Sequence, residues 1–235
     1  MTDAARRAEI AAGLDRVRTR VADACAQVGR SADEVSLTVV TKFFPASDVH
    51  LLAGLGVRDL GENRHQEAEA KAHECADLDV RWHFIGNLQS NKAAAVARYA
   101  DVVESVDRAK LLTGLSRGAH EADRQVDCLV QVSLDPDPKA GRGGAAPRDV
   151  AALAEQVAAA DGLRLRGVMA VAPPGGDPQP CFEKLAALAA DVRLVDPAAT
   201  WISAGMSGDL EAAVRAGATH VRVGSAILGQ RPSNR

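Results

Sequence analysis

Hydrophobic residues follow two patterns that alternate along the chain: short β-branched runs, and longer stretches in which polar residues separate the apolar ones. The short runs are typical of buried strands, and the longer stretches repeat apolar residues at three- and four-residue steps, as amphipathic helices do. The first long stretch predicts a helix over residues 3–28, which Gly29 ends. Eight strands are predicted after it, over residues 36–42, 57–61, 80–86, 101–106, 126–134, 163–171, 200–204 and 220–224.

A helix is predicted after each of the first seven strands. These helices cover residues 45–55, 64–76, 90–99, 108–122, 147–160, 180–192 and 210–216. Ser90 and Asp209 are predicted to cap the helices that they precede, since their side-chain oxygens accept hydrogen bonds from unpaired N–H groups. The stretch 135–144, rich in proline and glycine, predicts a loop.

Eight strands alternating with helices, behind one leading helix, are typical of a (β/α)8 TIM barrel. A doubly wound open sheet shares the alternation, but eight units in 235 residues favour a closed barrel. No linker or shift in composition divides the chain, which predicts one α/β domain over residues 1–235. The low aromatic content, 3%, and the abundance of small aliphatic residues also suit helices packed on parallel strands.

Charge and cysteine content argue against several classes of protein. The 28 Lys and Arg residues nearly balance 31 Asp and Glu residues without a basic tract, so no nucleic-acid partner is expected. No apolar run is long enough to cross a membrane, and the N-terminus lacks the core of a signal peptide. The four cysteines form no C-x-x-C pair and no two histidines have metal-ligand spacing, so a cytoplasmic protein without a metal site is expected.

A lysine ends the first predicted strand. Side chains alternate across a strand, so Lys42 shares a face with Thr38 and Val40 and is expected to point into the barrel. Lysine is rarely buried without a partner, and the alternative is a stem that packs while the amine reaches water. In TIM barrels the active site lies at the carboxyl ends of the strands, where Lys42 stands.

The last two strands lead into glycine-rich turns, residues 205–209 and 224–229, each with a serine. Tight turns alone explain either set of glycines, but barrels commonly bind phosphate at this place, and two adjacent turns with matching serines favour a phosphate site. Arg222 is expected to point inward near the same mouth. It either contacts a ligand or forms a salt bridge inside the barrel with an acidic partner that the sequence does not identify.

Three further residues have plain structural interpretations. Asn63 follows the second strand and suits a helix cap as well as a site residue. His83 is predicted to be a core histidine with its hydrogen bonds satisfied, and Met169 to fill the core. No nucleophile triad is visible, so no catalytic residue is assigned.

A lysine, a phosphate site and an arginine at one barrel mouth suggest a phosphorylated aldehyde held as a Schiff base. Partial burial and the neighbouring Arg222 would favour the neutral amine of Lys42, which is the form that attacks a carbonyl. Pyridoxal 5'-phosphate (PLP) fits, because it carries an aldehyde on one side and a phosphate on the other.

With these motifs in order, the chain resembles the pyridoxal phosphate homeostasis protein family, which shares the barrel of the alanine racemase N-terminal domain. The motifs are VVTK at 39–42, GEN at 61–63, WHFIG at 82–86, QSNK at 89–92, GMS at 205–207 and VRVG at 221–224. The resemblance implies that Lys42 forms the Schiff base with PLP and that Arg222 faces the pyridine nitrogen. It also implies further cofactor-binding residues: Ser207, Gly224 and Ser225 at the phosphate, and Asn63 and Met206 beside the cofactor.

The resemblance implies a carrier in PLP (vitamin B6) homeostasis and amino- and keto-acid balance, with PLP-dependent apoenzymes as partners, and no robust catalysis. Arginine, unlike a carboxylate, leaves the pyridine nitrogen unprotonated and weakens the ring as an electron sink. An amino-acid racemase is the alternative, but it needs a second acid or base, and the only tyrosine, Tyr99, precedes the fourth strand. A Schiff-base aldolase without cofactor is a third hypothesis. A monomer is expected, because the domain that dimerises racemases has no counterpart after the eighth strand.

Overall fold

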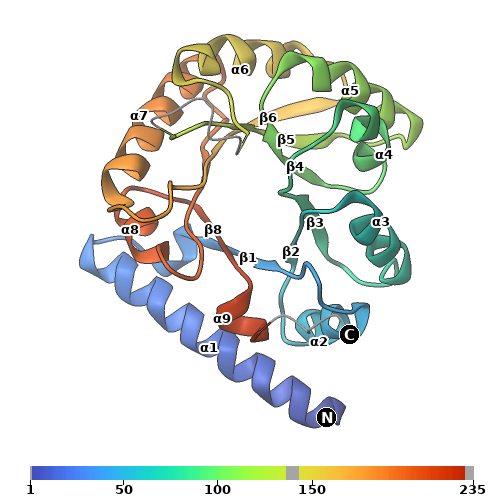
Figure 1. Cartoon of the computed structure of the whole chain (residues 1–235), viewed down its shortest axis with the longest axis vertical. Helices are drawn as coiled ribbons and strands as arrows, with labels where there is room; N and C mark the ends of the chain where they lie inside the picture. The colour runs from blue at the N-terminus through green and yellow to red at the C-terminus, as the bar shows by residue number, and fades with distance from the viewer. Residues whose placement is uncertain (1, 136–142, 231–235) are drawn as a thin grey trace.

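The strands form a closed parallel barrel in the computed structural model, which describes residues 2–135 and 143–230. Within this part of the chain eight strands pair in chain order, and β8 returns to pair with β1 (Figure 1). Their bounds are β1 Ser36–Val40, β2 Asp59–Glu62, β3 Arg81–Phe84, β4 Val102–Val106, β5 Val126–Gln131, β6 Leu163–Met169, β7 Trp201–Ser203 and β8 His220–Val223. The predicted TIM barrel is confirmed, and the open sheet is wrong because its two edges are joined.

Helices lie outside the strands and form the outer ring of the barrel (Figure 1). They are α1 Asp3–Gln27, α2 Ala46–Gly54, α3 His65–Glu74, α4 Ala93–Ala97, α5 Leu112–Glu121, α6 Val150–Ala159, α7 Gln179–Val195, α8 Leu210–Arg215 and α9 Ser225–Leu228. Three of the predicted helices begin as 3-10 turns, a common start of an α-helix: Ser90–Lys92, Ala109–Leu111 and Pro147–Asp149. None of the helices in the described part of the chain is long and apolar enough to span a membrane.

Both predicted helix caps are wrong. Ser90 lies within a 3-10 turn whose preceding residue is Gln89. Asp209 stands at the start of α8, but its carboxylate accepts a hydrogen bond at 2.6 Å from the backbone N–H of Met206 instead of capping the helix. Aspartate side chains often bond to nearby backbone groups in this way, and here the bond closes the turn after β7. Most of the predicted loop at 135–144, residues 136–142, lies outside the described residues.

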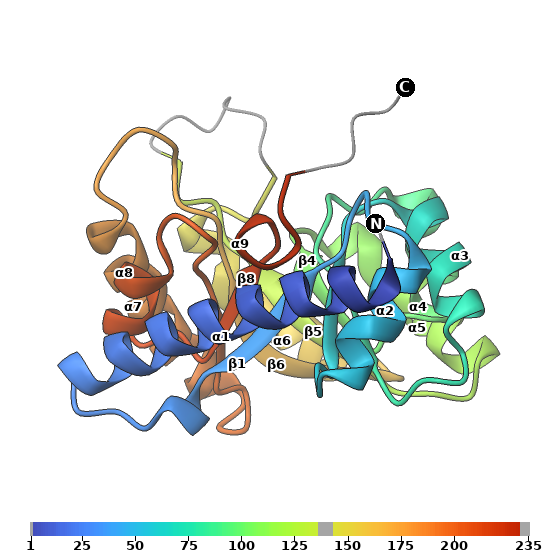
Figure 2. The same cartoon turned by 90° about the horizontal axis from the view of Figure 1, so that it is seen from below.

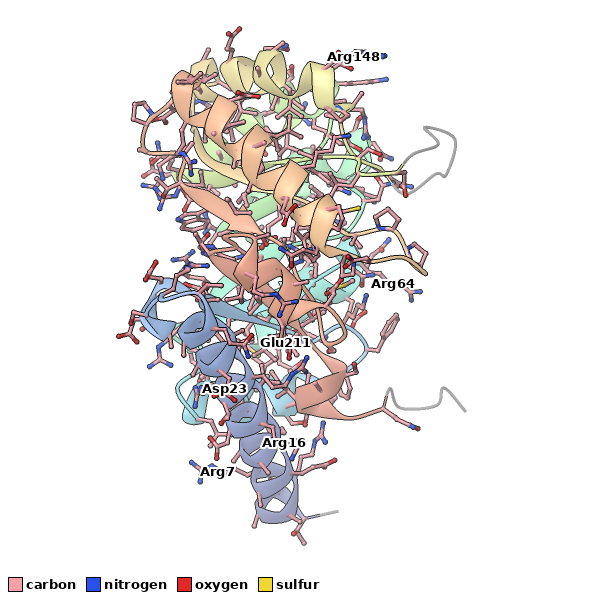
Figure 3. The ribbon with its side chains drawn as sticks, turned by 90° about the vertical axis from the view of Figure 1, so that its left-hand side faces the viewer. Arg7, Arg16, Asp23, Arg64, Arg148 and Glu211 are labelled. Atoms are coloured by element: carbon pink, nitrogen blue, oxygen red, sulfur yellow. The ribbon has the colours of Figure 1, made fainter. Side chains whose placement is uncertain are left out.

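The leading helix α1 packs along the outside of the barrel, across α8 and α9 (Figure 2). One face of α1 is buried in the core beneath it, at Ile10, Leu14, Val17, Val21, Ala24 and Cys25. Gly13 makes close packing on α9 possible, since a Cβ there would lie 2.5 Å from the carbonyl oxygen of Ile227. Arg7, Arg16 and Asp23 are exposed along α1, and Glu211 lies beside the helix (Figure 3), where it pairs with Arg20 at 2.7 Å.

Candidate cofactor-binding site

A cavity of about 250 Å³ opens at the carboxyl ends of the strands. Six of the seven predicted site residues line it: Lys42, Met206, Ser207, Arg222, Gly224 and Ser225. They come from the connections after β1, β7 and β8, from β8 itself and from the first residue of α9. The structure therefore brings a primary amine, a guanidinium and two hydroxyl groups to one space, while their contacts with a cofactor stay a prediction.

Lys42 lies in a turn just beyond β1, and not on the strand as predicted. The strand ends at Val40, and the backbone N–H of Phe44 donates to the carbonyl oxygen of Thr41 at 3.0 Å. Lys42 and Phe43 are therefore the two central residues of a four-residue turn. Phe43 has a φ of +71°, a region that residues with a side chain rarely adopt. The turn places Lys42 at the cavity wall, so the predicted inward position holds although the strand is shorter.

Two serine hydroxyls and a glycine form one side of the cavity. The Oγ atoms of Ser207 and Ser225 lie 3.3 Å apart, although Ser207 follows β7 and Ser225 begins α9. Gly224 lets this side approach β1, because a Cβ there would lie only 2.9 Å from the carbonyl oxygen of Val40. Outside the cavity, Arg20 donates to the carbonyl oxygen of Ser207 at 3.0 Å and holds its turn against α1. Paired hydroxyl groups of this kind can donate hydrogen bonds to phosphate oxygens.

Arg222 is buried, with 3% of its surface exposed, and its guanidinium is held by three groups. Its Nη1 donates to Ser203 Oγ at 2.6 Å and lies 3.5 Å from Glu104 Oε2, and its Nη2 donates to the carbonyl oxygen of Ala170 at 2.9 Å. Burial lowers the pKa of Arg222, and the charge of Glu104 opposes that effect. The two interpretations of Arg222 are therefore compatible: it belongs to an internal salt bridge and also lines the cavity.

A chain of alternating charges continues from Arg222 through the barrel interior. Glu104 Oε1 lies 2.8 Å from His83 Nδ1, and His83 Nε2 lies 2.9 Å from Asp59 Oδ1. Burial disfavours the charged form of His83, but its two carboxylate partners outweigh burial and raise its pKa to about 9. Burial likewise disfavours charged Glu104, yet His83 and Arg222 hold its pKa at about 2. At neutral pH the side chains of Asp59, His83, Glu104 and Arg222 therefore alternate in sign.

Glu104 and Ser203 support Arg222 and are not among the residues predicted from the sequence. A glutamate in the middle of the apolar strand β4 was the available signal, because a carboxylate there requires a buried partner. The prediction for His83 is confirmed, since it is buried and both ring nitrogens have partners. Met169 is also confirmed as a core residue, packed with Val102 and Leu129.

Asn63 is the one predicted site residue that does not line the cavity. It directly follows β2, where a Cβ on Gly86 would come within 2.1 Å of its carbonyl oxygen. The side-chain Oδ1 of Asn63 is buried and has no hydrogen-bond partner among the described residues. Its contact with a cofactor therefore stays a prediction.

Comparison with known proteins identifies the family. The family model for the alanine racemase N-terminal domain matches residues 14–232. A pyridoxal phosphate homeostasis protein from Mycobacterium bovis is 41% identical over 243 residues, which cover 96% of this chain and 94% of that protein. This chain belongs to the pyridoxal phosphate homeostasis protein family. The resemblance predicted from the sequence motifs is confirmed.

Two solved structures are similar to this member of the pyridoxal phosphate homeostasis protein family. PipY of Synechococcus elongatus, solved with PLP bound, is 35% identical with a TM-score of 0.81 and covers 94% of this chain and 100% of its own. Alanine racemase from Corynebacterium glutamicum has a TM-score of 0.64 at 15% identity, over 93% of this chain and 61% of the racemase. The second likeness shows the shared fold alone.

Proposed function

We propose that this chain binds PLP reversibly as a Schiff base on Lys42 and serves in intracellular PLP homeostasis. The observation that carries the proposal is the cavity in which Lys42, Arg222 and the Ser207–Ser225 hydroxyl pair meet. These groups fit the three functional parts of PLP, namely its aldehyde, its pyridine nitrogen and its phosphate. The PLP-bound structure of the relative PipY supports the same ligand.

Each lining group has a distinct task in this proposal. The neutral amine of Lys42 adds to the aldehyde carbon, a C=N bond forms, and the carbonyl oxygen leaves as water with the two amine protons. Hydrolysis of that bond releases the cofactor unchanged. Ser207 and Ser225 donate to phosphate oxygens, and Gly224 lies beside them at the phosphate. Met206 and Asn63 provide further contacts at the edge of the cofactor.

Arg222 is the residue that favours holding PLP over using it. Its guanidinium only donates hydrogen bonds, and Glu104, Ser203 and Ala170 fix its orientation in the barrel. A fixed cation at the pyridine nitrogen disfavours protonation of that nitrogen, and an unprotonated ring withdraws electrons weakly. Carbanion chemistry on the cofactor is therefore disfavoured.

The lining of the cavity also supports a carrier over a racemase. Among the residues described at the cavity wall, Lys42 is accompanied by no carboxylate, histidine, cysteine or tyrosine that would act as a second acid or base. Tyr99 stacks on His65, with ring centroids 5.9 Å apart, and does not line the cavity. We propose a single PLP-binding domain over residues 1–235, monomeric and cytoplasmic, that supplies PLP-dependent apoenzymes.

Titration of the protein with PLP, followed by visible absorbance, tests this function. The wild-type chain should acquire the absorbance of a Schiff base, Lys42→Ala should not, and Arg222→Ala should lose the cofactor faster on dialysis. A screen for turnover of amino acids accompanies the titration. Amino-acid turnover that disappears in Lys42→Ala would overturn the carrier role in favour of a racemase. A protein that shows no spectral response to PLP would overturn the proposal and direct attention to an aldolase that acts on a sugar phosphate.

A further inference from the structure

A buried ionic cluster lies directly behind the turn that carries Lys42. We define the Lys71 cluster as Lys71 of α3 with Glu62 and Glu67. Lys71 Nζ lies 2.6 Å from Glu62 Oε1 and 2.8 Å from Glu67 Oε1. Lys71 is 6% exposed and Glu62 is 1% exposed, so these charges are largely removed from water. Burying charged groups costs free energy unless each group is paired, so we expect this cluster to have a role.

The cluster binds the backbone on both sides of Lys42. Lys71 Nζ donates to the carbonyl oxygen of Thr41 at 2.7 Å, and Glu67 Oε1 accepts from the backbone N–H of Phe43. These are the two peptide groups that flank the Cα atom of Lys42. In addition, the hydroxyl group of Thr41 donates to Glu62 Oε1 at 2.7 Å. The Lys71 cluster therefore holds Thr41 and Phe43, the residues directly before and after Lys42.

The turn needs such support because of Phe43. Its φ of +71° places a residue with a side chain in the left-handed region, where glycine is usual at the third position of a turn. A conformation of this kind persists only where surrounding contacts enforce it. The bond from the Phe43 N–H to Glu67 and the bond from Phe44 to Thr41 are two such contacts.

We propose that the Lys71 cluster positions Lys42: it holds both flanking peptide groups so that the amine meets an aldehyde in one fixed orientation. Glu62, Glu67 and Lys71 are positioning residues, since they act on Lys42 through the backbone and do not line the cavity. The inference rests on the proposed Schiff base with PLP. Misplacement of a reacting group by about 1 Å is enough to slow a reaction by up to about a hundredfold.

Substitution of Glu67 tests the proposal, because 23% of its side chain is exposed and its loss leaves the Glu62–Lys71 pair intact. Glu67→Ala removes the acceptor for the Phe43 N–H, whereas Glu67→Gln keeps an oxygen at that place. Glu69→Ala, on the exposed face of the same helix, is the matched control. The first measurement is hydrogen exchange of the Phe43 amide in the protein without PLP. We expect exchange to become about tenfold faster in Glu67→Ala and to stay near wild type in the other two variants.

The second measurement is the rate of Schiff-base formation after mixing with PLP. It should fall about tenfold in Glu67→Ala and recover in Glu67→Gln, with thermal unfolding of both followed in parallel. A wild-type rate in Glu67→Ala, or an equally slow rate in Glu67→Gln, would overturn the positioning role and leave the PLP proposal standing. If the wild-type chain itself forms no Schiff base, the proposed function fails, and amide exchange still decides whether the cluster holds the turn.

A double variant provides an independent check should Glu67→Ala not fold. Lys71→Met combined with Glu62→Gln removes both charges of the buried pair, so that neither is left uncompensated. It also removes the donor to the Thr41 carbonyl oxygen. The proposal requires slower Schiff-base formation in this variant, and a rate equal to that of wild type would overturn it.

Discussion

Glu104 is the residue on which the charges inside the barrel depend. It is 1% exposed and stands between two cations, with Arg222 at one oxygen and His83 at the other. Glu104→Gln keeps the shape of the side chain but replaces one acceptor oxygen by an amide group that only donates. In the native protein His83, Ser203 and Arg222 all donate to the carboxylate of Glu104. In the variant, the amide N–H groups therefore face at least one of these donors.

The expected loss of stability follows from the burial of these charges. Removing one partner of a buried ion pair destabilises a protein by about 3–5 kcal/mol, since the other charge is left uncompensated. For a chain of this size that corresponds to a decrease in Tm of roughly 10 °C. The assay is equilibrium unfolding in urea, followed by the fluorescence of the two tryptophans, Trp82 and Trp201. The ring centroids of Trp201 and His220 lie 4.3 Å apart.

Glu155→Gln is the matched control, because Glu155 is an exposed glutamate on α6. It should change the free energy of unfolding by less than about 0.5 kcal/mol. A loss below about 1 kcal/mol in Glu104→Gln would refute the reasoning, since the charge of Glu104 would then not compensate buried Arg222 and His83. PLP retention should fall together with stability, because Glu104 also orients Arg222.

Two further predictions follow from the same structure. The pKa of His83 is raised from 6.5 to about 9 in the folded protein, so its contribution to stability is complete below pH 6.5. That contribution, about 3 kcal/mol, should be lost as the pH rises through 9 in unfolding experiments, and a flat profile there would contradict a charged His83. Gly13→Ala should destabilise the protein by about 1–3 kcal/mol, measured in urea, because its Cβ would press on Ile227; unchanged stability would refute close packing of α1 on α9.

The barrel and most of the candidate site were predictable because they depend on regular repeats. The period of the apolar residues determined strands and helices, and in a parallel barrel all strands end at one mouth. Lys42, Ser207, Arg222 and Ser225 could therefore be placed together without any knowledge of contacts. Errors arose where one side chain decides the local structure, as at Asp209, whose carboxylate bonds to the N–H of Met206 and does not cap α8.

The supporting residues could not be predicted, because their partners are distant in sequence. Glu104 and Arg222 are 118 residues apart and meet only across the closed barrel. Lys71 has an ordinary sequence context on a charged helix, and its burial against Thr41 follows from how α3 packs on β2 and β3. Hydrophobic periodicity indicates which face of an element is buried, but it does not indicate which polar groups meet there.

The packing of α1 has a consequence for biosynthesis. Arg6 donates to the carbonyl oxygen of Leu228 at 3.0 Å across 222 residues of sequence, and Arg20 holds the turn of Ser207. A segment that is synthesised early thus supports segments that are synthesised much later. Because such contacts join α1 to residues far along the sequence, the side of the mouth that carries Ser207 and Ser225 cannot assemble before α9 has been synthesised. If the proposed function holds, the nascent chain should become able to bind PLP only when β8 and α9 have emerged.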